Sequence, residues 1–188
     1  FKDASADRET ILAWWTADPA AMIGTPTGTA SGIIAVDLDT DTAKGLDGPA
    51  AFAALVKSAG EPIRTRKHRT PRGGLHLLFA HPGEPVKNSA SGIAAGVDTR
   101  GDGGYIVLPP SKTGAGEYRV ETDAAPAPLP PWLAGLFRRH GIMAAPAASK
   151  PPAPPRTLPP GCPPSVAALV AAGASEGQRN DRALAVAV

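Results

Sequence analysis

The sequence predicts a mixed α/β or α+β domain over about residues 1–143. Short apolar runs between turn residues alternate along the chain with segments of helical spacing. Of the 188 residues, 43% are hydrophobic and 19% are charged, which is typical of a domain with a packed core. The composition changes over residues 144–164, where nine prolines predict an extended linker, and residues 165–188 are predicted to begin a helical segment.

Three helices are predicted from their capping residues and apolar spacing. The first follows Asp7, whose carboxylate suits a helix N-terminus. The second has Pro49 near its start and Gly60 as its stop. The third has Pro131 at its start and Gly141 just after two arginines of its last turn.

Four segments carry the signals of strands or strand edges. The clearest is the apolar run 33–36, which leads directly into Asp37-Leu38-Asp39 and is predicted to be a buried strand. Residues 105–108 form a second apolar run that stops at two prolines. The other two are residues 75–80, a strand after a diglycine, and residues 92–98, a strand or its edge. Residues 24–32 are rich in threonine and glycine and are predicted to be a loop.

Charge and cysteine content exclude several classes of protein. The net charge of +2 is too balanced to indicate nucleic-acid binding by itself. The one cysteine, Cys162, excludes an intramolecular disulfide and a cysteine-cluster zinc site, and it suits a reducing cytosol, so a cytoplasmic location is expected. No apolar run approaches 18 residues, so no membrane span is expected.

Asp37 and Asp39 form the sharpest chemical signal. Residues two apart in a strand point to the same face, and two carboxylates there repel one another unless a cation lies between them. Such oxygen ligands suit Mg²⁺ or Mn²⁺. A strand-end pair that merely caps a turn is an equal alternative. A calcium-binding loop is excluded by Thr42 and Gly48 at its sixth and twelfth positions, Asp41 disfavours a haloacid-dehalogenase-type phosphotransferase, and a metal-dependent glycosyltransferase stays open.

His76 shares one face of the predicted strand 75–80 with Leu78. A lone histidine in an apolar strand is more often structural than functional. However, Gly73 and Gly74 precede it, and glycines let a backbone approach a phosphate closely. The basic stretch over residues 64–72 adds positive charge suited to phosphate, although by itself it is best explained as a solvated loop.

Asp98 and Arg100 share a face if their segment is extended. A third carboxylate beside the pair at residues 37 and 39 would complete a two-metal site. The alternative is a local ion pair between Asp98 and Arg100 at the surface. Asp102 is better explained as a turn residue than as a ligand.

Trp14 and Trp15 lie on the first predicted helix and admit two interpretations. They can stack on nucleic-acid bases. The alternative is packing of an amphipathic helix against the core, which we expect for at least one of them.

Taken in this order, the motifs resemble the bifunctional DNA primase/polymerase N-terminal domain, part of the archaeo-eukaryotic primase superfamily. The resemblance covers about residues 1–140. Such domains occur in replication proteins of phages, plasmids and prophages. The matching segments are Phe1-Lys2-Asp3-Ala4-Ser5, Trp14-Trp15, Ile23-Gly24 with Thr27-Gly28, Ile34-Ala35-Val36-Asp37-Leu38-Asp39, Thr70-Pro71-Arg72-Gly73-Gly74-Leu75-His76, Gly96-Val97-Asp98-Thr99-Arg100-Gly101-Asp102-Gly103-Gly104-Tyr105 and Pro109-Pro110-Ser111.

The resemblance implies an α+β fold in which helices pack on a catalytic sheet of the RNA-recognition-motif (RRM) type. It implies template-directed nucleotidyl transfer, as a DNA primase, a DNA polymerase or both, in the replication of a phage, plasmid or prophage. Single-stranded DNA template and nucleoside triphosphates are the implied partners, with a helicase domain or helicase protein as a further one. A non-catalytic DNA-binding or replication-initiation module is the alternative. The family's N-terminal helix and strand normally precede the position of Phe1, so residues 1–143 are expected to be an incomplete catalytic domain.

The resemblance also assigns roles to residues, and Gly74 departs from its pattern because the superfamily often has serine there. Asp37, Asp39 and Asp98 would hold two Mg²⁺ or Mn²⁺ ions and, with His76, form the catalytic set. The implied nucleotide-binding residues are Arg72, Gly73, Gly74, His76 and Arg100. The basic residues proposed to contact DNA are Arg64, Arg66, Lys67 and Arg69.

Overall fold

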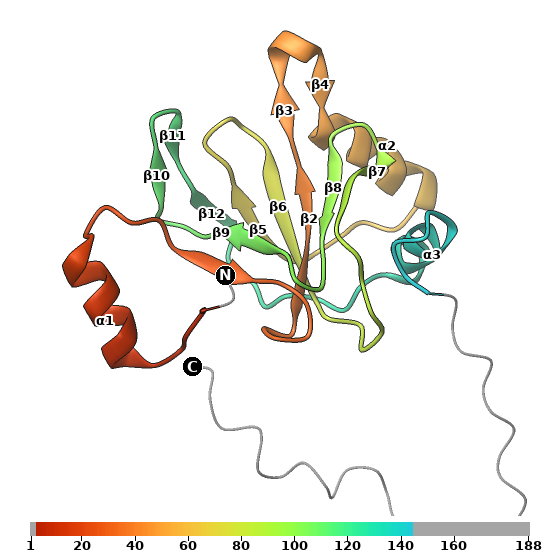
Figure 1. The fold of residues 1–188 in the computed structure, drawn as a ribbon. Coiled ribbons are helices and arrows are strands. Elements are labelled where there is room, and N and C mark those ends of the chain that lie inside the picture. Colours follow the sequence, from red (N-terminus) through yellow and green to blue (C-terminus); the bar gives the residue numbers. More distant parts are fainter. Residues whose placement is uncertain (1–2, 145–188) are drawn as a thin grey trace, which may run out of the picture.

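The computed structural model describes residues 3–144, which form an α+β fold built on a six-stranded antiparallel sheet (Figure 1). The sheet has the strand order β12-β5-β6-β2-β8-β7. The predicted linker beyond Ala144, the predicted helical segment 165–188 and Cys162 lie outside the described residues. The elements are α1 (Arg8–Ala17), β1 (Gly24–Pro26), β2 (Ile33–Leu38), β3 (Thr40–Asp41), η1 (Thr42–Lys44), β4 (Leu46–Asp47), α2 (Gly48–Ala59), β5 (Arg66–Arg69), β6 (Leu75–Ala80), β7 (Ser89–Ala94), β8 (Val97–Arg100), β9 (Tyr105–Val107), β10 (Lys112–Thr113), β11 (Gly116–Glu117), β12 (Arg119–Thr122) and α3 (Pro131–Arg139).

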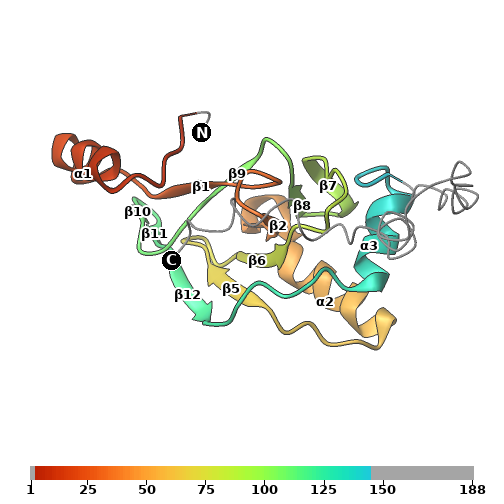
Figure 2. The same cartoon turned by 90° about the horizontal axis from the view of Figure 1, so that it is seen from below.

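The two faces of the sheet have different partners because side chains alternate along each strand. Ile34, Val36 and Leu38 of β2 face the main core, where they pack with side chains of α2 and α3 such as Phe52 and Phe137. On the opposite face lies the two-stranded ribbon of β1 and β9, with Ile106, Ala35 and Leu78 in a second, smaller cluster. Figure 2 shows α2 and α3 on one side of the sheet and the β1–β9 ribbon on the other.

The predicted helices are confirmed together with their capping residues. Asp7 accepts a hydrogen bond from the Thr10 N–H (2.8 Å) at the start of α1. Gly60 ends α2 in the left-handed conformation, with φ of 69°, which glycine adopts without strain. In α3, Leu133 and Phe137 are fully buried. None of the helices in residues 3–144 is both long and apolar enough to cross a membrane.

The strands predicted at residues 33–36, 75–80 and 105–108 are confirmed, but three segments differ from expectation. Residues 92–98, predicted to be a strand or its edge, contain the end of β7, a turn and the start of β8. Residues 24–26, predicted to be part of a loop, form β1 and pair with β9. The basic stretch contains β5. Its residues do not alternate between apolar and polar, which is the pattern by which a strand is predicted from sequence. The strand is stabilised instead by charge pairs with the segment that carries β12, since Arg66 pairs with Asp123 and Arg69 pairs with Glu121.

Gly135 in the middle of α3 offers a simple test of the helix. A Cβ built there meets no atom closer than Arg139 Nη1 at 3.6 Å, which is ordinary contact. Alanine loses less backbone entropy than glycine in a helix. We therefore expect Gly135→Ala to raise the free energy of unfolding by about 0.5–1 kcal/mol, measured by urea titration. An unchanged or lower free energy of unfolding would show that α3 is less regular than described.

Candidate active site

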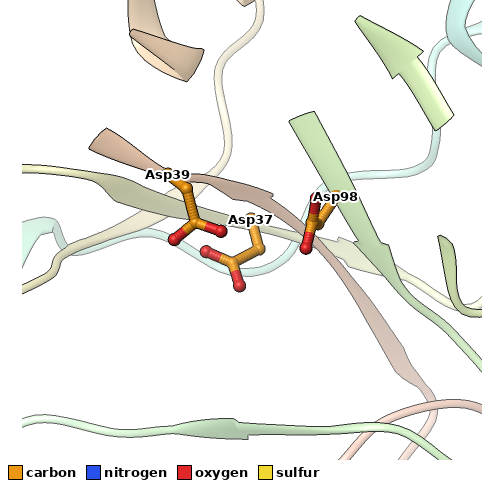
Figure 3. Close-up of side chains that lie close together, drawn as sticks. All are labelled: Asp37, Asp39 and Asp98. Atoms are coloured by element: carbon orange, nitrogen blue, oxygen red, sulfur yellow. The ribbon is translucent and has the colours of Figure 1, made fainter. Parts of the chain in front are cut away.

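Three carboxylates converge on the face of the sheet that is turned away from α2 and α3. Asp37 lies on β2, Asp39 follows directly after this strand, and Asp98 lies opposite Asp37 on the neighbouring strand β8. One oxygen from each carboxylate lies within 4.8 Å of the others, and Figure 3 shows the three side chains grouped together. Asp37 and Asp98 are buried, whereas Asp39 is exposed. The structure thus brings together the three residues that the sequence motifs singled out.

Arg100 is the cation within this acidic group. Its Nη2 donates to Asp37 Oδ2 (3.0 Å) and to Asp98 Oδ2 (3.1 Å), and its Nε also donates to Asp37 Oδ2 (3.2 Å). The backbone N–H of Ser91 donates to the other oxygen of Asp98, Oδ1 (2.7 Å). The ion pair expected between Asp98 and Arg100 therefore exists, but it is part of a half-buried network that also includes Asp37.

Burial dominates the electrostatics of the group. It raises the pKa of the Asp37 carboxyl, against the lowering effect of Arg100. Burial also raises the pKa of Asp39, and the negative charges of Asp37 and Asp98 raise it further. Burial disfavours the charge on Arg100, but the combined attraction to Asp37, Asp98 and Asp39 outweighs this and raises the pKa of the guanidinium. The group contains three carboxylates and one guanidinium, that of Arg100, so it has an excess of negative charge.

The donor set fits a divalent cation. Within residues 3–144 the Asp39 carboxylate accepts no hydrogen bond, so both of its oxygens are available. A hard cation such as Mg²⁺ or Mn²⁺ binds carboxylate oxygens and would relieve the repulsion that raises the pKa of Asp39. Asp37, Asp39 and Asp98 are the residues that would hold it.

His76 lies next to Asp37 on the neighbouring strand β6, with its Nε2 3.4 Å from Asp37 Oδ1. The ring is buried, and its centroid lies 5.8 Å from that of Tyr118. Burial, followed by the charge of Arg100, lowers the pKa of His76 to about 4. The ring is therefore neutral at pH 7 in the free protein, and it offers a substrate a hydrogen bond rather than a positive charge.

The diglycine before His76 forms a tight turn beside the acidic group. Gly73 has φ of 89°, and a Cβ at Gly74 would lie 2.3 Å from the carbonyl oxygen of Leu38, so no larger residue fits there without movement. The hydroxyl of Thr40 donates to the Arg72 carbonyl oxygen (2.6 Å). These contacts give the turn a structural purpose, because they dock it against the end of β2. They also place Arg72 beside the acidic group.

Two adjoining hollows of about 370 Å³ and 520 Å³ open around the acidic group and share Asp37, His76 and Tyr118 as lining. The first extends toward Arg100 and β9, and the second toward Thr40, Arg72 and the β10–β11 hairpin. Sequence reasoning missed Tyr118, because no local pattern marks it. Tyr118 directly follows the β10–β11 hairpin and is positioned at its base, where its N–H donates to the Ser111 carbonyl oxygen (2.8 Å). Burial, and then the charges of Asp37 and Asp39, raise the pKa of its hydroxyl.

The four basic residues proposed to contact DNA do not form one surface. Arg64 precedes β5, and the next three predicted contacts lie on the strand, where alternation sends them to both faces. Arg66 donates to His68 Nε2 (3.1 Å) on the face of the acidic group, whereas Lys67 lines a hollow on the face of α2. Arg69 donates to the Gly73 carbonyl oxygen (3.0 Å). Contact with DNA by these residues stays a prediction.

His68 predicts how acid affects stability. Burial, and then the charges of Arg66 and His76, lower its pKa from 6.5 to about 4. A proton therefore binds His68 more readily in the unfolded chain than in the folded protein. The contribution of neutral His68 to the free energy of unfolding is fully present above pH 6.5 and should be lost progressively as the pH falls toward 4. Between pH 7 and pH 5 we expect His68 to account for a loss of about 1–2 kcal/mol.

A His68→Gln variant isolates this contribution, because the shifts of His76 and the aspartates remain in both proteins. Urea unfolding at pH 7 and at pH 5 should show a smaller loss in the variant than in the wild type. An equal loss in both proteins would contradict the assigned role of His68.

The family model described as bifunctional DNA primase/polymerase, N-terminal, matches residues 1–132. A search of curated proteins found no match.

Proposed function

Because the chain belongs to the bifunctional DNA primase/polymerase N-terminal family, we propose that it adds nucleotides to a growing strand under the direction of a single-stranded DNA template. The family indicates nucleotidyl transfer of the primase/polymerase type in replication. The main structural support for the proposal is the group formed by Asp37, Asp39 and Asp98, whose carboxylate oxygens lie within 4.8 Å of one another beside two hollows. We also propose that the antiparallel sheet is the RRM-type sheet of this superfamily, because its site lies on the face opposite the helices.

The proposed reaction joins the 3′-hydroxyl oxygen of a primer, or of a first nucleotide, to the α-phosphorus of an incoming nucleoside triphosphate. The bond between the α-phosphorus and the bridging oxygen to the β-phosphate breaks, pyrophosphate leaves, and the hydroxyl proton passes to solvent. Two Mg²⁺ or Mn²⁺ ions held by Asp37, Asp39 and Asp98 would supply Lewis-acid stabilisation of the charge that develops in this exchange.

The protein's own residues would bind and orient the substrates. Arg100 holds Asp37 and Asp98 in a fixed arrangement and lies on the wall of the first hollow, so its guanidinium can bind phosphate oxygens there. Arg72 supplies positive charge in the second hollow, which also contains Asp39. Neutral His76 and the Tyr118 hydroxyl lie between the two hollows and would position the triphosphate by hydrogen bonds.

Two rival functions use the same residues. A metal-dependent glycosyltransferase would employ the Asp37 and Asp39 pair without any template. A replication module that binds DNA without synthesis would not need a complete acidic group, so the convergence of Asp37, Asp39 and Asp98 favours the enzyme. The replication of a phage, plasmid or prophage is the proposed setting, and a helicase is a proposed partner.

The deciding experiment asks whether the template selects the nucleotide. The full chain is incubated with Mn²⁺, one labelled nucleotide at a time, and a primed template whose single-stranded part is either oligo(dT) or oligo(dC). We expect adenine nucleotides to be added on oligo(dT) and guanine nucleotides on oligo(dC). Addition without regard to the template would contradict templated synthesis, and DNA binding without addition of any nucleotide would favour the binding module.

A further inference from the structure

A third hollow, of about 420 Å³, lies between α1 and the β1–β9 ribbon and has an apolar lining. Its walls include Trp14, Met22, Pro26 and Tyr105. Five large hydrophobic side chains are exposed in residues 3–144, and three of them line this hollow: Trp14 (41% exposed), Met22 (49%) and Tyr105 (57%). Exposed apolar side chains that gather in one place indicate a binding surface more strongly than the same number scattered over a protein.

The helix that carries Trp14 contributes nothing to the core, since α1 has no buried residue. Trp15 has a structural role, because its Nε1 donates to the Ala21 carbonyl oxygen (3.1 Å) and ties the helix to the chain that follows. Within residues 3–144 the indole of Trp14, whose ring centroid lies 6.5 Å from that of Trp15, makes no such hydrogen bond. Its exposed indole therefore needs another explanation than packing against the core.

The hollow lies beside the candidate active site, on the other side of the β1–β9 ribbon. Tyr105 lines both this hollow and the one that contains Asp37 and Arg100. Its strand β9 pairs with β1, where Pro26 lies opposite Tyr105, so the ribbon separates the two spaces. A strand of nucleic acid bound across the ribbon can therefore reach both.

The chemistry of the lining selects one part of a nucleotide. Asp3 is the one charged side chain among the described lining residues, and its negative charge disfavours phosphate. Indole and phenol rings, by contrast, stack on bases of any sequence. An apolar, aromatic lining beside a nucleotidyl-transfer site thus suits unpaired bases of the template strand.

We propose that this hollow binds unpaired bases of single-stranded DNA next to the active site, with Trp14 and Tyr105 as the stacking surfaces. The proposal rests on the proposed function for the identity of the ligand. It assigns a purpose to α1 and to Trp14 that neither the core nor the acidic group provides.

Equilibrium binding of fluorescein-labelled oligonucleotides to the full chain tests the proposal. The probes are oligo(dT) and an abasic strand of the same length, which has the phosphates without the bases. For oligo(dT) we expect Trp14→Ala to weaken binding by about fivefold or more, and Trp14→Phe to restore most of the affinity because a ring is retained. For the abasic strand, wild type and Trp14→Ala should bind equally.

Leu12→Ala is the matched control. Leu12 is 49% exposed on the same helix but does not line the hollow, so its removal should leave the affinity for oligo(dT) unchanged. Equal binding of oligo(dT) by wild type and Trp14→Ala would overturn the proposal, as would equal weakening with both probes or an absence of any binding by wild type.

The binding assay and the template assay fail independently. Template-directed addition by wild type, with unchanged binding in Trp14→Ala, would refute the stacking site and leave the proposed function intact. Base-dependent binding through Trp14 without nucleotide addition would support the stacking site and refute the enzyme.

Discussion

The Asp37→Asn variant should stay folded and lose template-directed nucleotide addition by about a thousandfold or more, since stabilisation of charge by a bound metal amounts to several kcal/mol. Asp37 lies at the centre of the site, between Asp98 on one neighbouring strand and His76 on the other. The change keeps the shape of the side chain but removes the charge that a cation needs. Single-turnover rates with saturating Mn²⁺ and nucleotide would measure the loss.

The matched control for this variant is Asp7→Asn, which makes the same chemical change at an exposed helix N-terminus. Asp7 caps α1, and asparagine caps a helix about as well as aspartate does, so stability and activity should both be unchanged. Circular dichroism and thermal unfolding would show that both variants are folded. A rate within about tenfold of wild type for Asp37→Asn would exclude an essential role in metal binding for this carboxylate.

The Gly48→Ala variant should disturb the acidic group indirectly, by displacing the backbone of Asp39. The Gly48 N–H donates to the Asp39 carbonyl oxygen (2.8 Å), and the Asp39 N–H donates to the Gly96 carbonyl oxygen (2.8 Å). A Cβ at Gly48 would lie 2.2 Å from the Gly96 carbonyl oxygen and within 2.9 Å of the Asp39 backbone nitrogen. Because these are backbone atoms, the start of α2 and the backbone of Gly96 and Asp39 have to move apart.

We expect Gly48→Ala to lower the free energy of unfolding by about 1–3 kcal/mol, the usual cost of overpacking a buried position. The affinity for Mn²⁺ should fall as well, since the Asp39 carboxylate is displaced. Gly135→Ala, the same substitution in α3, should have the opposite effect on stability, which separates local crowding from a general effect of alanine. Wild-type stability and Mn²⁺ affinity in Gly48→Ala would show that this backbone contact is looser than the structure indicates.

The elements that sequence reasoning predicted correctly are those with strong local signals. Local residues specify these elements almost independently of the rest of the chain. Asp7 caps the start of α1, Gly60 ends α2, and β2 and β6 are apolar runs. By contrast, β5 consists of three basic residues and His68, and β12, one of its two partner strands, lies about fifty residues further along the chain, so pairing rather than pattern defines both strands. Local sequence cannot predict such pairing, because the stabilising contacts are long-range.

The same distinction applies to the site. Asp37 and Asp39 are adjacent because side chains alternate in a strand, which sequence alone predicts. The position of Asp98 opposite Asp37 depends on the register between β2 and β8, which the motif around Asp98 and the family resemblance suggested but did not determine. Tyr118 follows directly after the β10–β11 hairpin, which was not predicted from sequence. Its place beside His76 is therefore known from the structure alone.

The most direct test of the account is the binding of Mn²⁺ to the full chain, followed by electron paramagnetic resonance of the free ion. Wild type should bind Mn²⁺ saturably at a site that weakens by about tenfold or more in Asp39→Asn, because a ligand is lost. Asp39 is exposed, so this variant should keep the fold. Identical Mn²⁺ titrations for wild type and Asp39→Asn would contradict the claim that Asp37, Asp39 and Asp98 form the metal centre of a nucleotidyltransferase.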